Sequence, residues 1–72
     1  MMFYGNEYRK MTGVIRDISK QLVKVEFTKI QVKDNTVFVP KNIIKGKVEF
    51  EQGIEQDFQL PSWFLRRNKL VP

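Results

Sequence analysis

Residues 22–32 read LVKVEFTKIQV, and this stretch decides the expected fold. Val23, Val25 and Phe27 alternate with polar residues, which is the period of two of a strand with one face in the core. After Thr28–Lys29 the apolar positions change parity. We therefore expect a β-bulge there, which would restore one apolar face and bend the strand. Bent strands allow a small sheet to curl into a barrel.

Shorter apolar segments on either side complete the pattern. We expect further strands at Thr12–Ile18, Thr36–Val39, Val48–Glu51 and Asp57–Leu60, and turns at residues 19–21, 33–35 and 42–46. Pro40 ends its strand, because proline cannot donate to a ladder and belongs at an edge or a terminus. The expected fold class is mainly β, as a small four- or five-stranded SH3-like or OB-like barrel with a short C-terminal helix.

The C-terminal segment changes to a helical period. Pro61 suits the first position of a helix, where its missing N–H is not needed. Leu60, Trp63 and Phe64 then share one helical face that would cap the sheet. We expect a capping helix at residues 61–69, held in place by the docking of Trp63, since a helix of about two turns is marginal alone.

The length of 72 residues allows a single domain, residues 1–72, in which residues 1–10 are a candidate for a flexible arm. A chain this short buries only about 60% of its unfolded surface, so a ligand or a homodimer would help its stability. The absence of cysteine fits a reducing compartment. Residues 1–7 lack the features of a signal peptide, and no apolar run approaches about 20 residues. We therefore expect a cytoplasmic protein without membrane contact.

The net charge of +5 is unevenly distributed along the chain. Residues 1–47 carry ten Lys or Arg and four Asp or Glu, whereas residues 48–60 carry four acids and no base. Residues 61–72 add three bases. A folded chain with this order would present one positive face and one negative edge, which favours an anionic partner or a complementary protein surface.

The residue types needed for common enzyme chemistry are missing. There is no histidine and no cysteine, so the usual acid–base and nucleophile pairs cannot form. The acids alternate with apolar residues, which places them on solvent faces, where they serve solubility. No phosphate-binding or metal-ligand motif occurs. We expect a protein that is not an enzyme and that uses no cofactor and no metal.

Nucleic acid is the expected partner, bound without sequence specificity. Proteins of this kind combine a basic track with aromatic rings on which bases stack. Strand parity leaves Phe38 pointing outward, and Lys24, Lys29 and Lys33 could share an outer sheet face. The candidate nucleic-acid-binding residues are Lys24, Lys29, Lys33, Phe38, Lys41, Lys45, Lys47, Arg66 and Arg67.

Other interpretations of the same residues remain open. The lysines could form a merely solvated face, and Phe38 could cover a second small cluster under the N-terminal arm or the helix. For Trp63 and Phe64 we favour core packing over base stacking. The acidic residues 48–60 beside basic neighbours would also suit a homodimer or a protein-binding module that recruits or inhibits another protein. An exposed edge strand could accept a partner strand in such a complex.

Two motifs resemble those of a known group of proteins. Residues 37–44 read VFVPKNII, similar to an aromatic-x-Pro-Lys-x-x-Ile motif at a strand end, and residues 60–71 read LPSWFLRRNKLV, similar to a C-terminal Pro-x-Trp helix. Together they resemble small uncharacterised proteins of phages and other mobile elements, often encoded among DNA-metabolism genes. The resemblance covers roughly residues 21–72 and departs at Phe38, where the group has tryptophan. It implies an accessory protein of a mobile element, with Phe38 and Lys41 as positions of interest.

Overall fold

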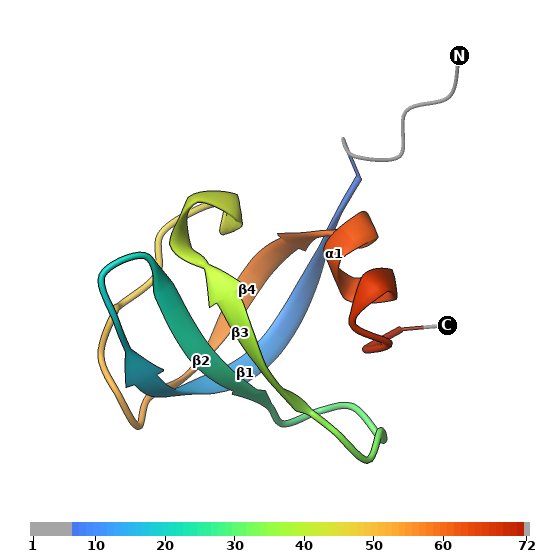
Figure 1. Ribbon diagram of the computed structural model, residues 1–72, viewed down its shortest axis with the longest axis horizontal. Helices are drawn as coiled ribbons and strands as arrows, with labels where there is room; N and C mark the ends of the chain where they lie inside the picture. The colour runs from blue at the N-terminus through green and yellow to red at the C-terminus, as the bar shows by residue number, and fades with distance from the viewer. Residues whose placement is uncertain (1–6, 72) are drawn as a thin grey trace.

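In the computed structural model of the protein, residues 7–71 are described, and they form one antiparallel sheet and one short α-helix (Figure 1). The elements are β1 (Tyr8–Ile18), β2 (Leu22–Phe27), β3 (Thr36–Pro40), the 3₁₀ turn η1 (Lys41–Ile43), β4 (Glu55–Pro61) and α1 (Ser62–Arg67). The sheet has four strands in the order β3-β2-β1-β4. The mainly β fold with a C-terminal helix is therefore confirmed.

The sheet is not closed into a barrel, because β3 and β4 form its two edges. After η1 the chain crosses toward the other edge, where the Lys45 N–H donates to the Gln59 carbonyl at 2.9 Å. This isolated bridge links the segment after η1 to β4. The sheet is strongly curved, and α1 lies beside the end of β4 (Figure 1).

The expected bulge after Phe27 is wrong, and the long strand ends there instead. The Phe27 N–H donates to the Asn35 carbonyl at 2.8 Å, and the Asn35 amide donates back to the Phe27 carbonyl at 2.9 Å. These bonds close a loop over residues 28–35. The change in the parity of the apolar residues after Lys29 is therefore caused by this loop and not by a bulge. The register shift that bends the sheet lies in β1 between Ile15 and Asp17. Such a shift strengthens the local twist.

The core lies on one face of the sheet and is completed by α1. Val23, Val25 and Phe27 of β2 are buried, as their parity predicts, and the Phe27 ring meets the Phe58 ring edge to face at a centroid distance of 6.4 Å. Aromatic pairs prefer this geometry. Gly13 of β1 lies opposite Phe27 in the ladder.

Helix α1 differs from its prediction in its bounds and in its anchor. Pro61 is the N-cap residue and the last residue of β4, so the helix begins at Ser62 and ends at Arg67. The expected docking of Trp63 is wrong, because Trp63 remains 40% exposed. Phe64 and Leu65 are buried and hold the helix against the core.

The helix ends in a Schellman motif with a lysine where glycine is usual. The Leu70 N–H donates to the Leu65 carbonyl at 2.9 Å, and the Lys69 N–H donates to the Arg66 carbonyl at 3.1 Å. Lys69 accordingly has a φ of 59°. Leu65 and Leu70 are both buried, which is the apolar contact that accompanies this motif.

Two further expectations differ from the structure. Val48–Glu51 does not form a strand and belongs to a loop, in which the Gln56 side chain donates to the Glu49 carbonyl and accepts from the Glu49 N–H. The proposed arm at residues 1–10 lies partly outside the described residues, but from Tyr8 onward the chain forms β1 and pairs with β4. Within residues 7–71 no helix has the length and apolar character needed to cross a bilayer.

Candidate nucleic-acid interface

The candidate interface lies on the face of β2 and β3 that points away from the core. Lys24 pairs with Phe38, and Leu22 pairs with Pro40, whereas the alternate residues Val23 and Val39 are buried. Side chains two positions apart on a strand share a face. Two cross-strand pairs therefore place a lysine and three apolar side chains side by side on the outer surface.

Phe38 and Lys24 are in direct contact on this surface. The Lys24 ammonium lies 5.9 Å from the centroid of the Phe38 ring, and the Phe38 side chain is 60% exposed. A cation over an aromatic ring at an exposed site contributes only about 0.5–1 kcal/mol. The ring is thus held beside a positive charge and remains open to solvent over most of its surface.

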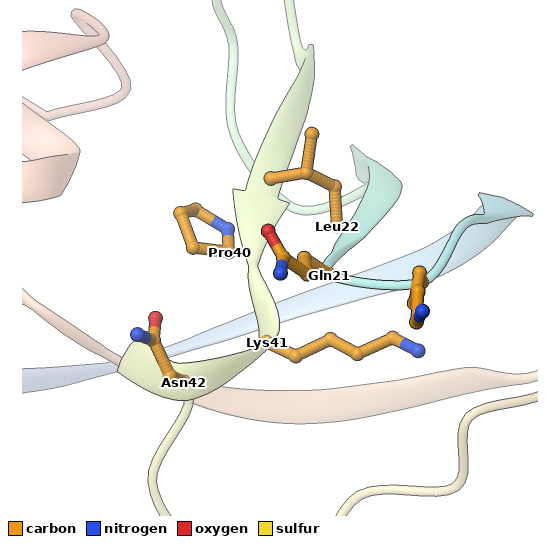
Figure 2. A pocket seen from close by; sticks show the side chains of 6 residues that line it. Gln21, Leu22, Pro40, Lys41 and Asn42 are labelled. Carbon is orange, nitrogen blue, oxygen red and sulfur yellow. The ribbon is translucent and has the colours of Figure 1, made fainter.

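A shallow depression continues the surface toward the end of the sheet where the β1–β2 turn meets η1. Its volume is about 570 Å³, and its lining residues are Lys20, Gln21, Leu22, Pro40, Lys41 and Asn42. The Lys41 N–H donates to the Gln21 carbonyl at 2.9 Å, which joins η1 to the β1–β2 turn. Figure 2 shows the Lys41 side chain extending along the depression and away from Asn42. Depressions of this size accommodate small organic groups.

A second pair of a lysine and an aromatic ring lies beyond the depression. The Lys41 ammonium lies 5.4 Å from the centroid of the Phe50 ring, which is 44% exposed. Phe50 belongs to the loop that the Gln56 amide holds at Glu49. We call the whole surface the basic–aromatic strip and define it as Lys20, Leu22, Lys24, Phe38, Pro40, Lys41 and Phe50.

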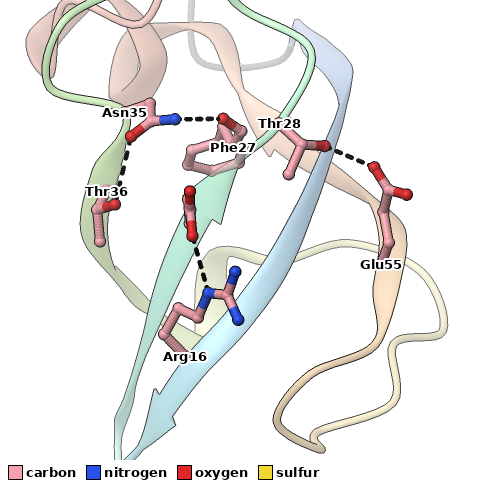
Figure 3. Close-up of polar contacts among 7 residues, drawn as sticks. Arg16, Phe27, Thr28, Asn35, Thr36 and Glu55 are labelled. Carbon is pink, nitrogen blue, oxygen red and sulfur yellow. Dashed lines mark hydrogen bonds and ion pairs between the residues drawn. The ribbon is translucent and has the colours of Figure 1, made fainter.

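Acidic side chains lie next to the strip on the same face of the sheet. Asp17 of β1 is directly opposite Lys24, and Glu26 of β2 bonds to Arg16 at 2.8 Å. On β4, Glu55 accepts a hydrogen bond of 2.7 Å from the Thr28 hydroxyl (Figure 3). Asp57 similarly accepts from Thr12 at 2.7 Å. Positive charge is therefore concentrated at the β3 side of the outer face, whereas toward β1 and β4 four carboxylates outnumber the cations of Lys10 and Arg16.

The outer edge of β3 presents peptide groups as well as side chains. Backbone bonds join Phe27 to Asn35 and Gln21 to Lys41 at the two ends of the β2–β3 ladder. Because such bonds alternate along an antiparallel strand, the peptide groups of Thr36 and Phe38 point away from β2. Pro40 occupies the next outward position and has no N–H to offer. The edge is thus short and blunted at one end.

The structure brings together three of the nine predicted binding residues. Lys24, Phe38 and Lys41 lie within the basic–aromatic strip. Lys29 and Lys33 are not on the sheet face with Lys24, because β2 ends at Phe27 and both lysines lie in the loop at its far end. This separation corrects the expected shared face.

The remaining predicted residues lie elsewhere on the molecule. The Lys45 ammonium lies 5.0 Å from the centroid of the Tyr8 ring near the start of β1, and Lys47 is exposed in the following loop. Arg66 and Arg67 are exposed in the last turn of α1. These four residues belong to other parts of the surface.

Sequence reasoning missed four members of the strip: Lys20, Leu22, Pro40 and Phe50. For Pro40 the sequence predicts only the end of a strand. The parity of β2 contained the signal for Leu22, because a residue next to buried Val23 must point outward. Lys20 lies in a turn and Phe50 in a loop, where no periodicity exists to orient a side chain. Only the tertiary arrangement brings these two residues beside Lys41.

Within the described part of the chain, no group of three or more acidic side chains is arranged to hold a metal ion. Comparison with family models, with curated proteins and with solved structures gives no match to this chain.

Proposed function

We propose that this protein is a small basic nucleic-acid-binding accessory protein that binds without sequence specificity and is not an enzyme. The observation that carries the proposal is the contact between Lys24 and the exposed ring of Phe38, repeated by Lys41 and Phe50 across a shallow depression. Lysines neutralise phosphates, and exposed rings stack on bases of any sequence. Both functions occur here in adjacent side chains.

The placement of these residues supports a binding role over a structural one. The core on the opposite face is complete without Phe38, and the Phe38 ring keeps most of its surface in solvent. Exposing a large apolar side chain on a sheet face gives the fold little stability. Its position beside a lysine is better explained by a partner that uses both groups.

The origin and setting of the protein belong to the same proposal. Its resemblance to phage and mobile-element proteins rests on residues 37–44 and 60–71, and Phe38 and Lys41 of the first motif lie in the strip. We propose a cytoplasmic accessory role in the DNA metabolism of such an element. For the fold, the curved sheet and the Lys45–Gln59 bridge support a partly open barrel of the SH3-like or OB-like kind.

The test compares two triple variants that lose the same charge. Lys20, Lys24 and Lys41 are replaced by glutamine in one variant, and Lys29, Lys33 and Lys47 in the control. We expect the first variant to weaken binding to labelled DNA and RNA oligonucleotides and to reduce the slope of log affinity against log salt by roughly two units. The control should retain most of the affinity. Equal losses in both variants would mean that binding depends on the total positive charge of the protein and not on the strip. No binding at low salt would exclude the proposed function.

A second candidate function follows from the edge of β3. The outward peptide groups of Thr36 and Phe38 could pair with an extended segment of another protein. The alternative is therefore a protein-binding module that recruits or inhibits a host or replication protein, or one that forms a homodimer. The mass of the protein in solution, measured by analytical ultracentrifugation, tests the homodimer. Replacement of Thr36 by proline removes one outward N–H and should weaken edge pairing while leaving binding to nucleic acid intact.

A further inference from the structure

The basic–aromatic strip follows β2 and β3 on the outer face and continues past the depression. It begins at the Lys24–Phe38 pair, continues two residues along both strands to Leu22 and Pro40, and reaches Lys41 and Phe50 beyond the depression. Two residues of strand span roughly 6.7 Å. The depression lies between the Phe38 and Phe50 rings, so the two rings do not form one aromatic cluster.

The charges beside the strip disfavour a double helix. A duplex carries phosphates on both sides of its major groove, which is about 12 Å wide, so a protein surface that fits it must be basic on both sides. Here Lys20, Lys24 and Lys41 lie on one side only. On the other side the carboxylates of Asp17, Glu26, Glu55 and Asp57 outnumber the cations of Lys10 and Arg16. The second row of phosphates would therefore meet a net negative surface.

The rings are accessible on a surface that a base can reach. Phe38 and Phe50 are each contacted by the ammonium of one flexible lysine, at an exposed site where that contact is weak. A lysine that turns from the ring to a phosphate would uncover the ring for a base and gain an ionic contact. A base inside a duplex is already stacked and cannot use such a ring without being unpaired.

We propose that the strip binds single-stranded nucleic acid, with one base stacked on Phe38, a second base stacked on Phe50, and the intervening backbone held by Lys20 and Lys41 beside the depression. This inference rests on the proposed function and adds to it the form of the nucleic acid and the two stacking positions. It assigns to Phe50 a role that its position in the sequence does not indicate.

The experiment measures binding of three labelled probes by fluorescence anisotropy at low and at moderate salt: an oligothymidine, a duplex of the same length and an oligomer of abasic sites. The variants are Phe38→Leu and Phe50→Leu, which keep an apolar side chain and remove the ring. Trp63→Leu is the matched control, because Trp63 is an exposed aromatic residue on α1, outside the strip. Circular dichroism verifies that each variant is folded.

We expect the oligothymidine to bind at least about tenfold more tightly than the duplex. Each ring substitution should weaken oligothymidine binding by about five- to a hundred-fold, the usual loss for one stacked base, and should leave binding of the abasic oligomer unchanged. Trp63→Leu should change neither affinity.

Three results would overturn the inference, and only the third would also exclude the proposed function. Duplex binding as tight as single-strand binding would exclude a preference for single strands. Equal effects of the ring variants on the oligothymidine and the abasic oligomer would exclude base stacking on the two rings. The proposed function would then stand on the lysine variants alone. A wild-type protein that binds none of the three probes at low salt would instead exclude the function and the inference together.

Discussion

Gly13 lies directly opposite Phe27 in the β1–β2 ladder, and the missing side chain of Gly13 makes room for the packing around that ring. A Cβ at this position would lie 2.8 Å from Cγ1 of Val25 and 2.9 Å from the carbonyl oxygen of Glu26. These distances are shorter than van der Waals contact. Close packing at the centre of the sheet therefore depends on a glycine in the middle of a strand.

The first prediction is that Gly13→Ala destabilises the protein. Overpacking a well-filled core costs about 1–3 kcal/mol, and we expect a loss in this range in the free energy of unfolding, measured by urea denaturation. In the double variant with Val25→Ala, removal of the clashing methyl should make the combined loss smaller than the sum of the single losses. Strict additivity would mean that Gly13 and Val25 do not meet.

The second prediction concerns Lys69, whose φ of 59° lies in the left-handed region. Because glycine adopts this conformation without the penalty of a Cβ, Lys69→Gly should stabilise the protein by about 0.5–1.5 kcal/mol in thermal or urea unfolding. Asn68→Gly is the control. Asn68 has a φ of −96°, and its side chain donates to the Phe64 carbonyl, so this substitution should destabilise.

The third prediction concerns Ser62, which is fully buried and whose hydroxyl has no hydrogen-bond partner in the structure. Burying a hydroxyl without a partner is unfavourable, and alanine is a better helix former than serine. Ser62→Ala should therefore be neutral or stabilising by up to about 1 kcal/mol. Calorimetric melting would measure the change, and a clear loss of stability would contradict the structure around this side chain.

The fourth prediction concerns the anchor of α1. Leu65 is fully buried, whereas Trp63 is 40% exposed. Leu65→Ala should cost about 2–5 kcal/mol, the usual range for a large core residue, and Trp63→Ala should cost far less despite removing a larger side chain. Equal losses in chemical denaturation followed by circular dichroism would show that Trp63 does dock, as its sequence pattern predicts.

The fifth prediction links a loop contact to binding. The Gln56 amide makes two hydrogen bonds to the backbone of Glu49, at 3.0 and 2.8 Å, next to Phe50. Gln56→Ala removes both the acceptor of the Glu49 N–H and the donor to the Glu49 carbonyl without changing the net charge. We expect faster hydrogen exchange at the Glu49 amide and a several-fold weaker affinity for an oligothymidine. Unchanged exchange would mean that the loop is held by other contacts.

The strands could be predicted where period-two alternation is long enough to assign a face. Val23, Val25 and Phe27 are buried as expected, and Lys24 and Phe38 point outward. The strip itself could not be predicted, because it depends on the register that places Lys24 opposite Phe38. Register is set by the pairing of strands and by their turns, which a single sequence does not specify.

The errors have a common physical cause. Val48 and Phe50 alternate with acids like a strand, but β4 already pairs with β1, and the Gln56 side chain satisfies the Glu49 backbone in a loop instead. The expected bulge after Phe27 is wrong for the same reason, because the partners of each strand are not known from the sequence. The register shift lies in β1 instead. Short alternating segments therefore indicate which residues can form strands, and competition for partners decides which segments do.

The central position of β1 also determines how the chain is expected to fold. β1 pairs with β2 through a short turn, and it pairs with β4 across most of the length of the chain. Closing the longer loop costs more chain entropy, so the β1–β2–β3 meander should form early and β4 should join it late. The strip on β2 and β3 would then exist before the sheet is complete, while Phe50, the second stacking position, would arrive only with the last strand.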